Sequence, residues 1–330
     1  MKFVLEGRVL KSVSRSFYLT IRALPRGLRD PIGLAYLLAR TSDTIADSTN
    51  ALAAVRLAHL QAFRDMLGSG SSEEKLRALR DEIHPADPAE ARLIALAGDC
   101  LNALEQSGEA DRREIARVME TIIRGQELDL LRFGDGTRPV ALASAADLDD
   151  YTYLVAGCVG EFWTRICFQH LRRYAHAEPG LMENLGRSFG QGLQLVNVLR
   201  DLPADLRAGR CYLPADELAA LGITGENVLQ FPELTQSVIE GWILRAENHL
   251  ADAQRYIEAV RSPRLRFACL LPWAMGLETL ALLRRNPPLT TPHRIKISRG
   301  EVRAIARRAV WAAFSNRRLA QMAGRYFARK

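Results

Sequence analysis

The chain has 330 residues, of which 48% are hydrophobic and 25% are charged, so it has the ordinary composition of a globular protein and is long enough to bury a large core. Its five cysteines are odd in number and form no CxxC pair, which excludes a disulfide framework and a structural zinc motif of that type. The net charge of +7 favours anionic partners: a nucleic acid, an anionic membrane surface or a phosphorylated substrate. The first residues contain no long apolar run, so we expect no signal peptide.

Apolar residues recur at helical spacing along nearly the whole chain, and runs of alternating β-branched residues are scarce. Clusters of turn-forming residues predict breaks between the helices. These breaks fall at residues 24–31, 68–74, 84–90, 133–139, 176–180, 213–217, 231–233, 261–264 and 284–293. The gaps are short, and none has the composition of a flexible linker. The sequence therefore predicts a single all-α domain over residues 1–330.

The first predicted helix with unusual chemistry contains the stretch YLLARTSDTIAD. Tyr36, Arg40, Asp43 and Asp47 stand at positions i, i+4, i+7 and i+11, which places them on one stripe of a helix. The residues off this stripe are mainly apolar. A polar stripe on an apolar helix must face a cavity, a partner stripe or a bound ion.

The stretch from residue 189 to 214 has the same design. Gln194, Asn197, Asp201 and Asp205 stand at i, i+3, i+7 and i+11 among apolar residues, and Arg200 adjoins the first aspartate. Each of the two predicted apolar helices thus carries a polar stripe, and each stripe ends in a DxxxD pair. Four facing carboxylates repel one another unless cations compensate them.

Mg²⁺ is the cation that this arrangement favours, because it takes oxygen ligands and shares its remaining sites with phosphate. Arg40 and Arg200 would then hold the phosphate groups through forked hydrogen bonds. Apolar helical walls around a metal-bound diphosphate suit the ionisation of an allylic prenyl diphosphate, since they exclude water from the carbocation. Pro203 lies inside the second pair and predicts a kink or a helix end near it.

Two later segments bear on membrane contact. Residues 267–283 are strongly apolar but include Pro272 and Glu278, so we expect a buried helix rather than a membrane span. Residues 301–330 mix arginines with aromatic residues and contain no acidic residue after Glu301. This tail is predicted to be a basic amphipathic helix. It either touches an anionic membrane surface or packs on the protein with a solvated basic face.

Four motifs in order resemble those of the squalene and phytoene synthase family, the head-to-head prenyl transferases. They are SRSF at 14–17, YLLARTSDTIAD at 36–47, YTYLVAGCVG at 151–160 and QLVNVLRDLPADLRAGRCYLP at 194–214. The likeness extends from about residue 10 to about residue 300. It implies an all-α isoprenoid-synthase helical bundle around a central prenyl-binding cavity.

The resemblance also implies roles for individual residues. The expected Mg²⁺ ligands are Asp43, Asp47, Asp201 and Asp205. The expected diphosphate contacts are Ser14, Arg15, Ser16, Tyr36, Arg40 and Arg200, and Gln194 and Asn197 would line the polar end of the substrate pocket. Tyr151 would handle a proton or stabilise a cation in the first step. Gly157 and Gly160 would allow close helix packing.

Among family members the chain is most similar to squalene synthases, because DTIAD resembles their first motif and IKISRGE at 295–301 resembles their NADPH-phosphate segment. The resemblance implies that two farnesyl diphosphates condense to presqualene diphosphate, which NADPH then reduces to squalene. Lys296 and Arg299 would contact the NADPH phosphate. The expected location is cytoplasmic, with peripheral contact on the inner face of a membrane.

Three other interpretations stay open or are weaker. The chain could release presqualene diphosphate, dehydrosqualene or a phytoene-like product without hydride transfer. It could instead be a non-catalytic helical binding or assembly protein, although its four aspartates are intact. A nucleic-acid binder is not expected, because no recognised motif is present and the aspartate stripes would repel phosphate without a metal.

Overall fold

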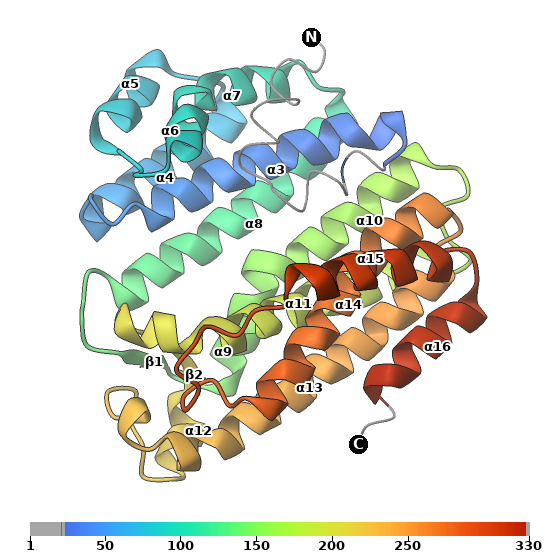
Figure 1. The fold of residues 1–330 in the computed structure, drawn as a ribbon. Helices are drawn as coiled ribbons and strands as arrows, with labels where there is room; N and C mark the ends of the chain where they lie inside the picture. The colour runs from blue at the N-terminus through green and yellow to red at the C-terminus, as the bar shows by residue number, and fades with distance from the viewer. Residues whose placement is uncertain (1–20, 22–23, 328–330) are drawn as a thin grey trace. The chain divides into compact units, whose positions relative to one another are not determined.

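The computed structural model describes Ile21 and residues 24–327, and Figure 1 shows the order of the elements. The chain divides into two compact units. The first unit contains the described part of residues 1–135 together with Arg165–His170, and the second contains Gly136–Thr164 and the residues from Leu171 onward. The predictions of a single domain and of a central prenyl cavity stay predictions. The SRSF motif at 14–17 lies outside the described residues.

The first unit is helical throughout its described part. Its helices are α3 (Arg26–Asp47), α4 (Ala53–Ser69), α5 (Glu73–Glu82), α6 (Pro88–Ala95), α7 (Ala97–Glu105) and α8 (Glu109–Phe133). Helix α3 packs against α4, α6, α7 and α8, so its apolar side chains form much of the core of this unit. Leu37, Leu38 and Ile45 are completely buried or nearly so. This packing holds the helix that carries the first aspartate stripe.

The second unit is built around α11, which packs against α13 and α14. Its elements are β1 (Val140–Leu142), α9 (Ala145–Thr152), the π-helical turn η1 (Tyr153–Gly157), α10 (Cys158–His170, whose last residues belong to the first unit), α11 (Pro179–Arg207), β2 (Arg210–Pro214), α12 (Ala215–Ala219), the 3₁₀ turn η2 (Val228–Gln230), α13 (Pro232–Ala259), α14 (Pro263–Arg285), α15 (Arg299–Ala312) and α16 (Asn316–Phe327).

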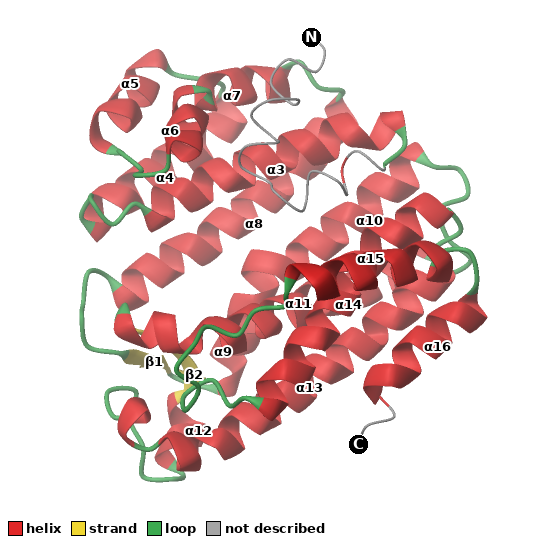
Figure 2. Cartoon of the chain, in the orientation of Figure 1, coloured by secondary structure: helices red, strands yellow, loops and turns green. Residues whose placement is uncertain are grey.

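The all-α prediction is confirmed, and the helices in Figure 2 account for nearly all of the regular structure. Two prolines that the sequence placed at breaks lie inside helices instead. Helix α3 begins at Arg26 and continues through Pro31, so the break predicted at 24–31 is shorter than expected. Helix α11 continues through Pro203 to Arg207, so Asp201 and Asp205 keep their helical spacing. In both helices the buried apolar face outweighs the loss of one backbone hydrogen bond.

A small parallel sheet that the sequence did not predict holds the end of α11. Strand β1 pairs with β2, and Val140 lies opposite Arg210. Gly209 makes the turn between α11 and β2 with φ of +79°, and a Cβ there would lie 2.1 Å from the carbonyl oxygen of Gly136. Only glycine fits both the backbone conformation and the space. The sheet thereby directs the chain back past the second aspartate pair.

The motif YTYLVAGCVG includes the turn η1, in which the helix widens from α to π geometry. Such turns are rare and insert one residue into a helix. The elements α9, η1 and α10 follow one another directly along the chain, and η1 packs against α11. The expectation that Gly157 and Gly160 permit close helix packing is confirmed, since a Cβ on Gly160 would lie 1.8 Å from the carbonyl oxygen of Gly186.

The C-terminal region contains two helices, α15 and α16, where the sequence predicted one basic helix over about 301–330. A turn at residues 313–315 separates them, and this lets both helices pack on α14. Helix α14 has the length and apolar composition of a membrane span, but 67% of its most apolar window is buried inside the protein. That burial agrees with the prediction of a packed helix. All five cysteines are free and buried.

Candidate functional site

The first aspartate stripe lies on α3, as its spacing predicted. Tyr36 and Arg40 are partly buried, Asp43 lies one turn further along, and Asp47 is the exposed last residue of the helix. The two carboxylates therefore stand in the last two turns, where the helix dipole is negative and no basic residue follows. The two like charges therefore have no basic residue of the last turn to compensate them.

Asp43 is the most perturbed carboxyl group of this stripe. Burial raises the pKa of Asp43 to about 6, and the charge of Asp47 adds to the rise. The side chain still keeps 46% of its surface open to solvent, so an ion can reach it. Gln126, on α8, donates a hydrogen bond of 2.5 Å from Nε2 to Asp43 Oδ1. The other amide atom, Gln126 Oε1, is buried and has no hydrogen-bond partner among the described residues.

Arg40 lies between two carboxylates. It pairs with Glu90 of α6, and its Nη1 lies 3.9 Å from Asp43 Oδ2. Burial raises the pKa of Tyr36, while the charge of Arg40 partly opposes that rise, so the phenol remains a proton donor at neutral pH. Tyr36, Arg40 and Asp43 are thus brought together on one side of α3. Glu90 could not be predicted from the spacing on this helix, because it lies on α6.

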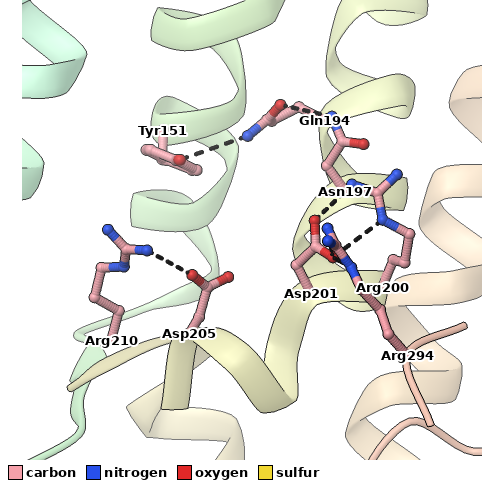
Figure 3. Close-up of polar contacts among 8 residues, drawn as sticks. All are labelled: Tyr151, Gln194, Asn197, Arg200, Asp201, Asp205, Arg210 and Arg294. Atoms are coloured by element: carbon pink, nitrogen blue, oxygen red, sulfur yellow. Dashed lines mark hydrogen bonds and ion pairs between the residues drawn. The ribbon is translucent and has the colours of Figure 1, made fainter. Parts of the chain in front are cut away.

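The second stripe lies on α11, and Figure 3 shows its polar contacts. Arg200 binds Asp201 through two hydrogen bonds, from Nε at 3.1 Å and from Nη2 at 2.5 Å. Arg294, from the loop between α14 and α15, donates to Asp201 Oδ1 from Nε at 3.1 Å and from Nη2 at 2.7 Å. Burial alone would raise the pKa of Asp201, but the two guanidinium groups outweigh it and lower the pKa below its usual value.

The rest of the stripe is held by β2 and by the YTYLVAGCVG motif. Arg210, in β2, donates to Asp205 Oδ1 at 2.9 Å. The ring of Tyr151 stacks on that of Tyr212, with centroids 4.6 Å apart. Gln194 Nε2 lies 3.5 Å from the Tyr151 hydroxyl.

Asn197 continues this polar chain, because its Nδ2 donates to Gln194 Oε1 at 3.3 Å. The predicted members of the second stripe therefore lie together with Tyr151 in one cluster (Figure 3). The cluster contains the Tyr151 phenol from α9 and, in order along α11, two amides and two carboxylates. It can orient a polar group of a ligand over the carboxylates.

The predicted cofactor residues lie close in sequence to this cluster. Lys296 is exposed, and Arg299 is the exposed first residue of α15. Arg294, two residues before Lys296, binds Asp201, so the basic segment 294–299 begins at the second aspartate pair. Exposed ammonium and guanidinium groups suit the phosphates of NADPH, and both predicted residues fit that role.

The carboxylates also suit divalent cations. Each DxxxD pair supplies oxygen ligands of the kind that Mg²⁺ prefers, and the buried, unpartnered oxygen of Gln126 adds a neutral oxygen beside Asp43. The described residues contain no group of three or more acidic, histidine or cysteine side chains that could hold a metal by themselves. Each pair would therefore share its cation with water or with ligand oxygens.

Some predicted site residues lie outside the described part of the chain, and some residues of the site were not predicted. Ser14, Arg15 and Ser16 fall outside the described residues. Gln126, Glu90, Arg294 and Arg210 were missed. Two of them could have been found from the sequence. Arg294 lies in the basic segment before Lys296, and Arg210 lies in the tail of the second aspartate motif. Gln126 carried no such signal.

Comparison with known proteins gives a consistent result. The model of the family described as squalene/phytoene synthase matches residues 10–301. The chain is 25% identical to the squalene synthase of Cyberlindnera jadinii over 301 residues, which cover 88% of this chain and 64% of that protein. It is 29% identical to the bifunctional lycopene cyclase/phytoene synthase of Colletotrichum graminicola over 257 residues, which cover 74% of this chain and 40% of that protein. The chain thus spans less than two thirds of the length of these relatives.

Among solved structures, that of TcSQS with the ligand BPH1237 is similar to this chain, with a TM-score of 0.77 and 22% identity. The likeness covers 98% of this chain and 90% of that one. It establishes the fold.

Proposed function

Because the chain belongs to the squalene/phytoene synthase family, we propose that it condenses two farnesyl diphosphate molecules head to head and reduces the product to squalene. The observation that carries this proposal is the second stripe of α11. There, two carboxylates on successive turns lie beside arginines and below the Tyr151, Gln194 and Asn197 cluster (Figure 3). A non-catalytic binding protein has no need for this arrangement.

In the proposed reaction, Asp43, Asp47, Asp201 and Asp205 would hold Mg²⁺, and the cation would supply stabilisation of negative charge on the diphosphate. Tyr36, Arg40 and Arg200 bind the diphosphate oxygens, together with Ser14, Arg15 and Ser16. Arg40 and Arg200 carry forked guanidinium groups for this purpose, and each already lies against a carboxylate of its own motif.

The Tyr151 hydroxyl is oriented by Gln194 and by the stacked ring of Tyr212, so it lies at a fixed position above the carboxylates. We assign it to proton handling or to stabilising positive charge during the first condensation. Lys296 and Arg299 would bind the phosphates of NADPH, which supplies the hydride for the second step. Gln194 and Asn197 orient the polar end of the substrate.

Product analysis tests the proposal directly. Purified protein would be incubated with farnesyl diphosphate and Mg²⁺, with and without NADPH, and the products identified by gas chromatography and mass spectrometry. We expect squalene only when NADPH is present, and presqualene diphosphate in its absence. A C30 product that is indifferent to NADPH would instead favour a dehydrosqualene-type or phytoene-type synthase, and no consumption of farnesyl diphosphate would favour the non-catalytic interpretation.

The same assay separates the two steps when Lys296→Gln and Arg299→Gln are compared with Arg303→Gln. Arg303 is exposed on the next turn of α15 and is the matched control for loss of one positive charge. The first two variants are expected to raise the KM for NADPH by about tenfold and to accumulate presqualene diphosphate. Identical behaviour of all three variants would remove NADPH contacts from this segment.

We also propose that the protein touches a membrane surface through the corner between α15 and α16. Trp311 and Phe314 expose 65% and 67% of their surfaces there, and the Arg318 guanidinium lies 5.6 Å from the Trp311 ring. Exposed aromatic rings beside arginines suit the boundary between headgroups and acyl chains. Such contact would bring an apolar product to the lipid phase.

Vesicle flotation tests this surface. Replacing Trp311 and Phe314 together with serine is expected to lower flotation with anionic vesicles by about tenfold, because two apolar side chains are lost from the interface. Leu52→Ser is the matched control, since Leu52 is 68% exposed and lies in the first unit. Equal flotation of the double variant and the unmodified protein would exclude this corner as the contact.

A further inference from the structure

A cavity outside the proposed reaction site lies among the last three helices. It has a volume of about 450 Å³. Its lining comes from α14, α15 and α16: Glu278, Arg285, Arg308, Gly324, Arg325 and Tyr326. Helix α16 and most of α15 follow residue 301, where the match to the family model ends. Most of this lining therefore belongs to a part of the chain to which the family match assigns nothing.

The cavity has an excess of positive charge. Three of its lining residues are arginines, and Glu278 is the one carboxylate among them. Glu278 Oε2 accepts a hydrogen bond of 3.0 Å from the Tyr326 hydroxyl. Within the described part of the chain, no carboxylate forms an ion pair with Arg285, Arg308 or Arg325.

One further carboxylate, Glu301, lies near enough for its charge to interact with that of Arg285, but it accepts a hydrogen bond from the Ser298 backbone and does not line the cavity. No acidic residue follows Glu301, whereas eight arginine and lysine residues do. Burial and the charge of Glu278 raise the pKa of Tyr326 to about 12, so its hydroxyl stays protonated. Arg308 is partly buried and Arg285 and Arg325 are exposed, and an anion bound between the three guanidinium groups would relieve their mutual repulsion.

We propose that this cavity binds a phosphate-bearing anion through Arg285, Arg308 and Arg325. A guanidinium group can donate two parallel hydrogen bonds to two oxygens of one phosphate group. Three guanidinium groups supply more hydrogen-bond donors than a single carboxylate can accept. The volume is sufficient for a diphosphate or for a phosphorylated headgroup. The site does not depend on the reaction proposed above.

Two sources could supply this ligand chemistry. One is a soluble diphosphate. The other is the headgroup of an anionic lipid, which the exposed Trp311 and Phe314 at the corner between α15 and α16 would bring near. The binding contacts at the phosphate are the same in both cases. Separate arms of one experiment distinguish them.

In the first arm, isothermal titration calorimetry measures the binding of inorganic diphosphate to the full chain in EDTA, which removes divalent cations from the aspartate pairs. We expect Arg308→Gln and Arg325→Gln each to weaken binding by about tenfold or more. The matched control is Arg307→Gln, because Arg307 is the exposed neighbour of Arg308 on α15 and does not line the cavity. Circular dichroism verifies that each variant is folded.

In the second arm, the same variants are mixed with phosphatidylcholine vesicles, with and without phosphatidic acid. A larger loss of sedimentation for Arg308→Gln than for Arg307→Gln, on the acidic vesicles alone, identifies the lipid headgroup as the source. A difference in the calorimetric arm alone identifies the soluble anion. If the cavity variants and the control behave alike in both arms, the proposal is wrong. Farnesyl diphosphate consumption by each variant, measured in parallel, reports separately on the proposed reaction.

Discussion

Asparagine in place of Asp43 is expected to lower kcat with farnesyl diphosphate by at least about a hundredfold. The change removes one of two carboxylate charges at the C-terminal end of α3, and with it half of the charge that would attract Mg²⁺ to this pair. The asparagine oxygen can still accept the hydrogen bond from Gln126, so the helix packing is preserved. The assay is steady-state turnover as a function of Mg²⁺ concentration.

Thermal unfolding separates this effect from a loss of structure. In the unmodified protein, ionised Asp43 is repelled by Asp47, so the variant should unfold at a temperature no lower than the unmodified protein in EDTA. Added Mg²⁺ should then raise the Tm of the unmodified protein more than that of the variant. Asp81→Asn, an exposed charge change on α5, is the matched control. Near-normal turnover by Asp43→Asn would contradict the metal-binding role of the first stripe.

Alanine in place of Gly160 is expected to destabilise the second unit by about 3 kcal/mol or more. The new Cβ would lie 1.8 Å from the carbonyl oxygen of Gly186, a backbone atom that cannot rotate away. Helix α11 would have to move away from α10, and α11 carries the second aspartate pair. Chemical denaturation followed by circular dichroism measures the free energy of unfolding.

Gly241→Ala is the matched control for this substitution. Gly241 lies within α13, and a Cβ there would meet no atom within 4 Å. Alanine is favoured over glycine inside a helix, so this control is expected to stabilise the protein by about 1 kcal/mol. If the two substitutions had similar effects, the close approach of Gly160 to Gly186 would not matter for stability.

The helices and the order of the polar residues on α3 and α11 could be predicted from the sequence, because helical periodicity is a local property. The strands β1 and β2 could not, since they have three and five residues and pair across a long stretch of chain. The helix breaks predicted from Pro31 and Pro203 were also wrong, because tertiary packing keeps both helices intact at these prolines.

The same distinction applies to the site. The spacing of Asp43 and Asp201 on their own helices was sufficient to select them. Their partners Gln126 and Arg294 are 83 and 93 residues away in the sequence, and no local pattern joins such residues. The partners of a charged residue depend on tertiary structure, so the ion pairs of the site became visible only in the folded chain.

The π-helical turn η1 determines which faces of its helix can meet α11. Tyr151 and Gly160 are nine residues apart, and at about 100° per residue an uninterrupted α-helix would place them on opposite sides. The extra residue taken up by η1 brings them to within about 80° of each other. Both in fact contact α11, Tyr151 through Gln194 and Gly160 through Gly186. Gain of one residue here would rotate Tyr151 away from Gly160 by about 100°, whereas loss of one residue would leave a regular α-helix with both on the same side. The segment is therefore constrained against insertion, whatever its composition.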